Sequence, residues 1–186
     1  KDLKIDFEDS ENVKKFYNDA NNLNIALGEI HPVVNDPDGA HSGKNYYYFY
    51  KAGHWQEQYY RRVKLYTSGT SGNFVWLDPN SVYKVTYYIR VDDLSNAANL
   101  YLALFEDPES VKYGTYSFAA ENYMSIDSVI PVLGEWQKYE TTFVTGDNPA
   151  MLGFAMFGGY LTAAVDDITI SKLREVTVSF ESNGGS

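Results

Sequence analysis

The chain contains no cysteine, no long apolar run and comparatively few basic residues. The absence of cysteine from its 186 residues excludes disulfides, thiolate metal sites and cysteine nucleophiles. No stretch of about 18 apolar residues is present, so the sequence predicts no insertion into a membrane. Only 15 Lys and Arg stand against 25 Asp and Glu, which gives a net charge of −10. Nucleic acid and anionic membranes are therefore poor candidate partners, because both are polyanions.

Hydrophobic residues, and tyrosine above all, are abundant. They make up 44% of the chain, which at this length predicts one folded domain with its own core. The chain has 17 Tyr, 10 Phe and 3 Trp. Because tyrosine combines an apolar ring with a polar tip, it suits both half-buried strands and wet binding surfaces. This excess is the first indication of a binding function.

Alternating apolar and polar residues recur at spacings of roughly ten residues, separated by Gly, Asn, Asp, Pro and Ser. In the clearest stretch, Tyr83 to Val91, the odd positions are apolar and are predicted to face the core. The pattern predicts an all-β, two-sheet antiparallel β-sandwich, with one short helix inside residues 9–20. The predicted strands are residues 3–7, 24–34, 45–51, 59–66, 74–77, 82–91, 99–105, 124–129, 136–144, 151–157 and 163–173.

Five sequence fragments occur in an order that resembles a known superfamily. They are DFED, HSGKNYYYFY, LDPNSVYKVTYYIRVDD, GEWQKYETTF and AVDDITI, spread over about residues 5–171. In this order they resemble the jelly-roll carbohydrate-binding modules of the family 4, 9, 16 and 22 kind. The tail VTVSFESNGGS is similar to the start of a Listeria-Bacteroides repeat of the internalin B type. We therefore expect a jelly-roll sandwich at 1–173, with a linker and the first strand of a following β module at 174–186.

The resemblance also implies a structural calcium ion between the first and last strands. Its pattern places the metal ligands at Glu8 and Asp166, with a backbone oxygen from residues 42–44, such as that of Lys44, and Asp6 nearby. Hard cations prefer such carboxylate and carbonyl oxygens. The alternative is that these acids are ordinary solvated turn and strand-end residues.

A sugar site needs apolar ring faces beside planar polar groups, and the segment HWQEQYYRR is the densest cluster of that kind. The candidate ligand contacts from this segment are Trp55, Gln56, Tyr59 and Tyr60. Trp76 is a further candidate, although the apolar run FVWL also fits a packing role.

Outward positions of the predicted central strands supply the other candidates. They are Tyr88 and Arg90, then Tyr101, with Tyr47 from the strand at 45–51. So many aromatics on one exposed sheet surface would form a large apolar patch, which normally marks an interaction site. Trp136 matches the superfamily's structural tryptophan and is assigned to the core.

Enzymatic signatures are missing from the sequence. The three histidines lack HExxH spacing, and no G-x-S-x-G elbow, phosphate loop or dinucleotide fingerprint is present. We therefore expect no catalysis. The sequence predicts a non-catalytic carbohydrate-binding module of a secreted or cell-surface protein from a Gram-positive bacterium, linked covalently to neighbouring modules. The ligand would be a polysaccharide or oligosaccharide, such as starch or another plant or host glycan. The alternative is a structural or adhesion spacer domain.

Overall fold

The computed structural model describes residues 2–8, 14–20, 29–30, 33–51, 60–67, 76–95, 98–105, 123–157 and 159–177. These residues form strands without any helix, as the alternating sequence pattern predicts. The strands are β1 (Leu3–Ile5), β2 (Lys14–Ala20), β3 (Glu29–Ile30), β4 (Val33–Asn35), β5 (Asn45–Lys51), β6 (Tyr60–Thr67), β7 (Trp76–Leu77), β8 (Ser81–Leu94), β9 (Asn99–Phe105), β10 (Tyr123–Ser128), β11 (Gln137–Val144), β12 (Ala150–Phe157) and β13 (Leu161–Glu175).

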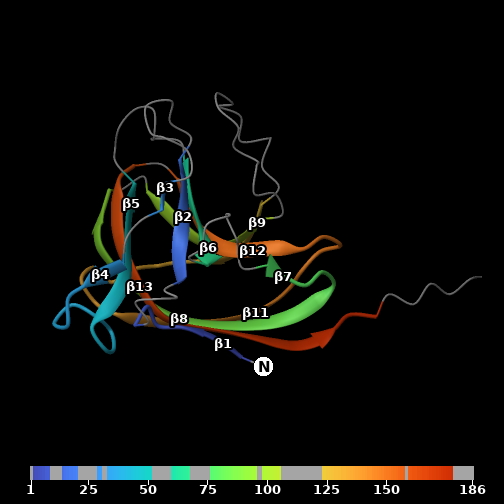
Figure 1. Cartoon of the computed structure of the whole chain (residues 1–186). Helices are drawn as coiled ribbons and strands as arrows, with labels where there is room; N and C mark the ends of the chain where they lie inside the picture. The colour runs from blue at the N-terminus through green and yellow to red at the C-terminus, as the bar shows by residue number, and fades with distance from the viewer. Residues whose placement is uncertain are drawn as a thin grey trace, which may run out of the picture.

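Two antiparallel sheets pack face to face (Figure 1). Sheet A has the order β11-β8-β13-β5-β4, and β1 pairs with β13. Sheet B has the order β10-β9-β12-β6-β2-β3, and β7 pairs with β12. Some neighbours in the sheets are far apart in sequence, since β13 lies between β8 and β5. The predicted all-β sandwich is confirmed.

Alternation along the strands fills the space between the sheets. In β8 the odd residues Tyr83 to Val91 are buried, as predicted, and the even residues face outward. Sheet B contributes Leu102 and Phe154 to the same core. The centre of the Phe154 ring lies 5.4 Å from that of Phe49 in sheet A. A fully buried side chain of this size stabilises the fold by roughly 1.5–3 kcal/mol relative to an exposed one.

The sequence predictions for residues 24–34, 14–20 and Tyr47 are wrong. The single strand predicted at 24–34 is, in its described part, β3 in sheet B and β4 in sheet A. Residues 14–20, predicted as the end of a helix, form β2. The strand pairs with β6 from Lys14↔Thr67 to Ala20↔Arg61. The i, i+3, i+4 spacing of Val13, Phe16 and Tyr17 was compatible with a helix, but pairing with β6 satisfies the backbone over the whole segment.

Tyr47 was predicted to contact ligand. It is completely buried, and its ring stacks on those of Phe49 and Phe7 at 5.9 and 6.1 Å. All but the first of the residues in NYYYFY are aromatic, so alternation in composition could not show which parity faces the core. Tyr47 belongs to the core.

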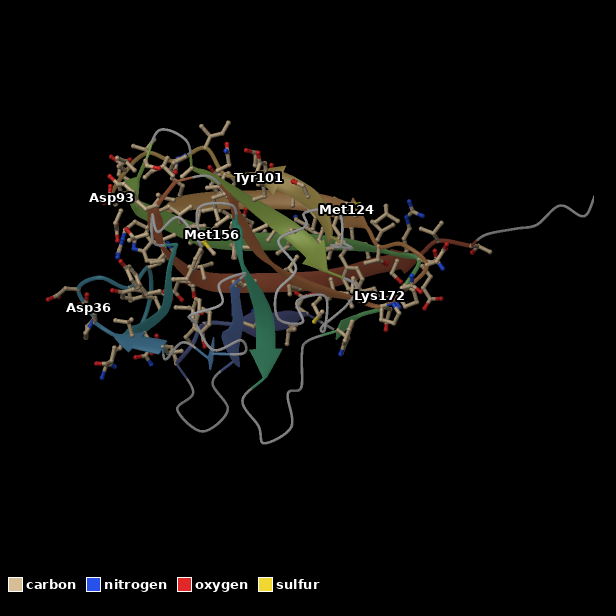
Figure 2. The ribbon with its side chains drawn as sticks, turned by 90° about the horizontal axis from the view of Figure 1, so that it is seen from above. Asp36, Asp93, Tyr101, Met124, Met156 and Lys172 are labelled. Atoms are coloured by element: carbon tan, nitrogen blue, oxygen red, sulfur yellow. The ribbon has the colours of Figure 1, made fainter. Side chains whose placement is uncertain are left out.

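The last strand is long. β13 pairs with β8 from Leu161↔Leu94 to Glu175↔Ser81, and the Val176 N–H donates to the Asn80 carbonyl at 2.7 Å. The predicted boundary between residues 173 and 174 therefore falls inside a paired strand. Figure 2 shows Lys172 toward this end of the molecule, with Asp93 toward the other.

Candidate functional site

The outward-facing surface of sheet A, here called face A, consists of the even positions of β8 and their neighbours on β5, β11 and β13. The segment Asp36–Asn45, here called the 36–45 loop, folds onto it. The Arg90 guanidinium lies between two aromatic rings on this face, 4.9 Å from the Trp136 ring centre and 5.3 Å from that of Tyr46. Such cation–π contacts contribute about 0.5–2 kcal/mol each.

Arg90 uses its hydrogen-bond donors inside the protein. Its Nε and Nη2 donate to the two carboxylate oxygens of Asp92 at 2.8 and 3.1 Å, and Nη1 donates to the Gly39 carbonyl at 2.6 Å. The Trp136 indole N–H donates to the same carbonyl at 3.1 Å. The Arg90 side chain is only 15% exposed. Both residues therefore hold the 36–45 loop against sheet A.

Tyr88 also contacts the 36–45 loop. The His41 ring stacks on it with 3.5 Å between ring centres, and His41 Nδ1 lies 2.6 Å from the Asp167 carboxylate. Trp136, assigned to the core from the sequence, lies instead on the outer side of sheet A, edge-on to His41 and Tyr46. Its role is structural, as predicted, but it packs under a loop and not between the sheets.

The predicted calcium ligands anchor the other half of this loop. Asp166 is completely buried, and its Oδ2 accepts the N–H groups of His41 and Ser42 at 3.1 and 3.3 Å. Glu8 Oε1 accepts the N–H groups of Lys44 and Asn45, both at 2.8 Å. Backbone donors thus occupy these carboxylate oxygens.

The remaining two predicted ligands also have protein partners. Asp6 accepts the N–H of Glu8 at 3.1 Å, and the Lys44 carbonyl accepts that of Asp36 at 2.8 Å. β1 and β13 do lie side by side, as the calcium prediction requires. Over the described part of the chain, however, no group of three or more acidic or histidine side chains is arranged to hold a metal ion. In this arrangement the acids clasp the 36–45 loop, and calcium stays a prediction.

Burial changes the acidity of Asp166, which holds the 36–45 loop. Burial, and then the charge of neighbouring Asp167, raises the pKa of Asp166 to about 6, although backbone donors from Ser42, Asp167 and His41 oppose the shift. Burial disfavours the charged form of a carboxyl, so the pKa rises. The folded protein therefore takes up a proton at Asp166 in mildly acidic solution.

The outward-facing surface of sheet B, here called face B, is built differently. Along β12, Leu152, Phe154 and Met156 face the core, so Met151, Gly153 and Ala155 occupy the outer positions. Ala103 of β9 lies opposite Gly153. Met151, Ala155 and Ala103 are also completely buried, although they lie outside the core between the sheets. The centre of face B is thus lined by small, covered residues.

Strand register brings three of the predicted ligand residues to face B positions. Trp76 lies opposite Met151, Tyr101 opposite Ala155, and Tyr60 opposite Phe157. Trp76 is 44% exposed and Tyr101 is half-buried. At about 3.3 Å per residue, these positions extend over about 20 Å along β12. This is the length of an extended chain of several sugar rings.

The sequence-predicted site is therefore divided. Tyr88 and Arg90 lie on face A, where contacts within the protein engage them. Trp76, Tyr101 and the Tyr60 position lie on face B. Trp55, Gln56 and Tyr59 lie outside the described residues, so their place is untested.

Sequence reasoning missed two features of these surfaces. His41 and Asp167 were not recognised as partners on face A, and no local pattern links residues 126 positions apart. The small residues of face B could have been found, because Gly153 and Ala155 share one parity of the strand MLGFAMF.

Comparisons with known proteins support the fold. No protein-family profile matches the chain, and no curated protein matches its sequence. Among solved structures, it is similar to the C-terminal family 22 carbohydrate-binding module of Clostridium thermocellum Xyn10B, with a TM-score of 0.53 and 11% identity over 94% of this chain and 96% of that one. At this identity the likeness shows a shared sandwich fold.

Two further solved structures are similar, both with lower scores. The CBM22-1 xylan-binding domain of Paenibacillus barcinonensis Xyn10C gives a TM-score of 0.47 at 12% identity, covering 95% of each chain. The CBM22-1-GH10 modules of Clostridium thermocellum Xyn10B, complexed with xylohexaose, give 0.49 at 14% identity, covering 91% of this chain. The present chain spans 28% of that two-module protein. No comparison supports the predicted internalin-type repeat.

Proposed function

We propose that this chain is a non-catalytic carbohydrate-binding module that binds an extended polysaccharide or oligosaccharide on face B. The observation that supports this most is that the positions of Tyr60, Trp76 and Tyr101 follow one another along β12, with Trp76 44% exposed. Aromatic ring faces pack against the C–H faces of pyranose rings, while the tyrosine hydroxyl and the indole N–H can bond sugar hydroxyls. A row of such rings suits a chain of sugars.

The charge pattern of face B supports binding without catalysis. Glycosidases need two carboxyl groups on either side of the scissile bond. Asp19, opposite Arg62 in register, is the single acid among the face B positions that the structure describes. The structural neighbours are themselves carbohydrate-binding modules, which favours the same role here.

The setting of the domain follows from the same proposal. The Clostridium thermocellum neighbours come from a xylanase with several modules, and we propose that this chain likewise belongs to an extracellular protein with covalently linked modules. Within the described residues, no helix is long and apolar enough to cross a bilayer. Xylan is the first glycan to test, because it is the ligand named for these neighbours.

The test is affinity electrophoresis and calorimetry against xylan, galactan, starch and mucin glycans. We expect at least one glycan to retard the protein and the variant Trp76→Ala to weaken that binding about tenfold or more. Tyr160→Ala is the control, because Tyr160 is equally exposed, at 45%, but precedes β13 in sheet A. Wild-type affinity in Trp76→Ala would place the ligand elsewhere, and no retardation by any glycan would contradict the proposal.

One observation favours the alternative of an adhesion or spacer domain. Ile130, Val132 and Leu133 are 77%, 50% and 55% exposed in a segment held by a hydrogen bond from Gly134 N–H to the Val91 carbonyl. Contiguous exposed apolar residues are a common feature of protein contacts. A protein-binding domain would show no retardation in the same glycan panel.

A further inference from the structure

The strand β11 forms one edge of sheet A and is regular over its whole length. Among the residues that the structure describes, it pairs with β8 alone. The pairing runs from Gln137↔Ile89 to Val144↔Val82 without a register shift. Proteins usually protect a sheet edge against pairing with another chain by proline, by bulges or by charged residues. Of these three, the sequence QKYETTFV of β11 has only the charged residues.

Hydrogen bonds at the two ends of β8 show which of its backbone groups face β11. The Ser81 carbonyl accepts the N–H of Thr145, directly after β11, at 2.9 Å. The Val91 carbonyl accepts the N–H of Gly134, shortly before β11, at 2.8 Å. Both acceptors are odd-numbered residues. The backbone groups of the odd residues of β8 therefore point toward β11.

The register transfers this alternation to β11. Odd residues of β8 lie opposite odd residues of β11, as in the pair Tyr139↔Tyr87. Successive residues of an antiparallel strand direct their N–H and C=O groups to opposite sides. The backbone groups of Lys138, Glu140 and Thr142 therefore point to the open edge, and their side chains are exposed. These three residues present backbone donors and acceptors that another strand could bind.

The charges on β11 make this edge complementary to itself. If two copies of the strand pair antiparallel about Tyr139, Lys138 of each copy lies opposite Glu140 of the other. A register shifted by two residues would instead place Lys138 opposite Lys138, or Glu140 opposite Glu140. Opposite charges across two strands stabilise their pairing, and like charges destabilise it. The existing Glu140–Lys84 ion pair is about half exposed, so it holds Glu140 only weakly.

Apolar side chains add to this complementarity. In the same register, Val144 of one copy is level with Gly134 of the other and so lies near the adjacent Leu133. Val144 is 50% exposed and Leu133 is 55% exposed. Association would therefore cover apolar surface at both ends of the pairing, which stabilises it by roughly 25 cal/mol for each Å² removed from water.

We propose that β11 is a self-association surface, on which two copies of this chain form a symmetric dimer. Their β11 strands pair antiparallel about Tyr139, and sheet A continues from one copy into the other. A surface that pairs with itself gives a closed dimer and leaves no further site for growth. At physiological ionic strength the Debye length is about 8 Å, so the two local ion pairs outweigh the repulsion between two chains of net charge −10.

Sedimentation equilibrium of the whole chain tests the dimer. It is run at physiological ionic strength and at protein concentrations from about 5 to 500 µM, because the dimer fraction rises with concentration by mass action. We expect the average mass to rise from that of one chain to that of two, and no further. A monomer at every concentration would overturn the proposal and show that Lys138 and Glu140 protect the edge.

Charge reversal tests the register. Lys138→Glu and Glu140→Lys each place like charges opposite one another at both symmetric positions, so each should raise the dissociation constant about tenfold or more. The double variant restores opposite charges and should return the constant to within about threefold of the wild type. Arg174→Glu is the matched control, because Arg174 is exposed on β13, two strands from the edge. It should leave association unchanged.

A further variant tests the backbone pairing. Thr142→Pro removes an N–H that points to the open edge and no N–H that bonds β8, so the fold should tolerate it while association is lost. Circular dichroism and thermal denaturation confirm that each variant is folded.

Two other results would overturn the proposal. One is a dimer that Lys138→Glu leaves intact or that Arg174→Glu weakens as much. The other is a double variant that associates no better than the single ones. Because no glycan takes part in these measurements, their outcome is independent of the proposed function.

Discussion

Face A and face B both carry aromatic residues, but in different settings. On face A, Arg90 lies between Tyr46 and Trp136, and its donors bind groups of the protein itself. On face B, Trp76 and Tyr101 stand at the two sides of β12 with small residues between them. Aromatic and basic residues on a sheet surface therefore do not by themselves identify a binding site, because on face A they hold a loop of the protein itself.

The comparison is tested most severely by removing Trp136. Its indole contacts Arg90 and donates to Gly39, so Trp136→Ala should release the 36–45 loop. We expect the free energy of unfolding to fall by about 3 kcal/mol, near the lower end for buried tryptophan. Glycan affinity should be unchanged. Urea denaturation and calorimetry measure both, and weaker glycan binding at unchanged stability would show that face A is the ligand site.

A second prediction concerns pH and the clasp at Asp166. Because its folded pKa is raised to about 6, the stability it contributes is complete below its ordinary pKa and is lost as pH rises through 6. A shift of this size corresponds to about 3 kcal/mol at most. We therefore expect the free energy of unfolding of the wild type, relative to that of Asp166→Asn, to decrease between pH 4 and pH 7 when both are measured in EDTA.

The same titration separates a clasp from a calcium site. With 5 mM CaCl₂, an ion bound by Glu8 and Asp166 would lower the pKa of Asp166 and stabilise the folded state at pH 7. The melting temperature would then rise with calcium at pH 7 and fall in EDTA. If, in EDTA, the free energy of unfolding of the wild type relative to Asp166→Asn increases with pH, the raised pKa of Asp166 is contradicted.

A third prediction compares one tyrosine substitution on each face. Tyr101→Ala should weaken glycan binding about tenfold, because an aromatic contact at a binding surface is worth roughly 1–2 kcal/mol. Tyr88→Ala should leave binding unchanged and lower stability, since it removes the ring on which His41 stacks. Isothermal calorimetry and thermal denaturation of the two variants are sufficient. The reverse pattern would assign the ligand to face A.

The smallest predicted effect is that of Arg90→Lys. Lysine cannot reproduce the bidentate contact with Asp92 or the stacking on Trp136, so we expect a loss of about 1 kcal/mol in unfolding free energy. Binding should not change. A variant as stable as wild type would show that the guanidinium contacts on face A contribute little.

The sequence predicted the fold well because alternation is a local signal. In β8, the odd residues from Tyr83 to Val91 are apolar and are buried, as the pattern indicates. Tyr47 was misplaced because its strand is aromatic on both sides. Residues 14–20 were misassigned because their strand pairing with β6 is a contact between distant segments.

The candidate site was predicted in its residue types but not in its location. Tyr88 and Tyr101 were grouped on one surface, yet they lie on different sheets, and only the strand order shows this. The 36–45 loop covers face A through carboxylates more than 120 positions away, at Asp166 and Asp167. Such contacts leave no pattern in a single sequence.

The most direct test of the central claim is a backbone amide NMR titration of the labelled protein with a glycan that retards it. Binding on face B predicts concentration-dependent shifts at Trp76, Tyr101 and Ala155, with Tyr88 and Ala164 on sheet A unchanged. Shifts centred on Tyr88 and the 36–45 loop, with Tyr101 and Ala155 unaffected, would contradict it.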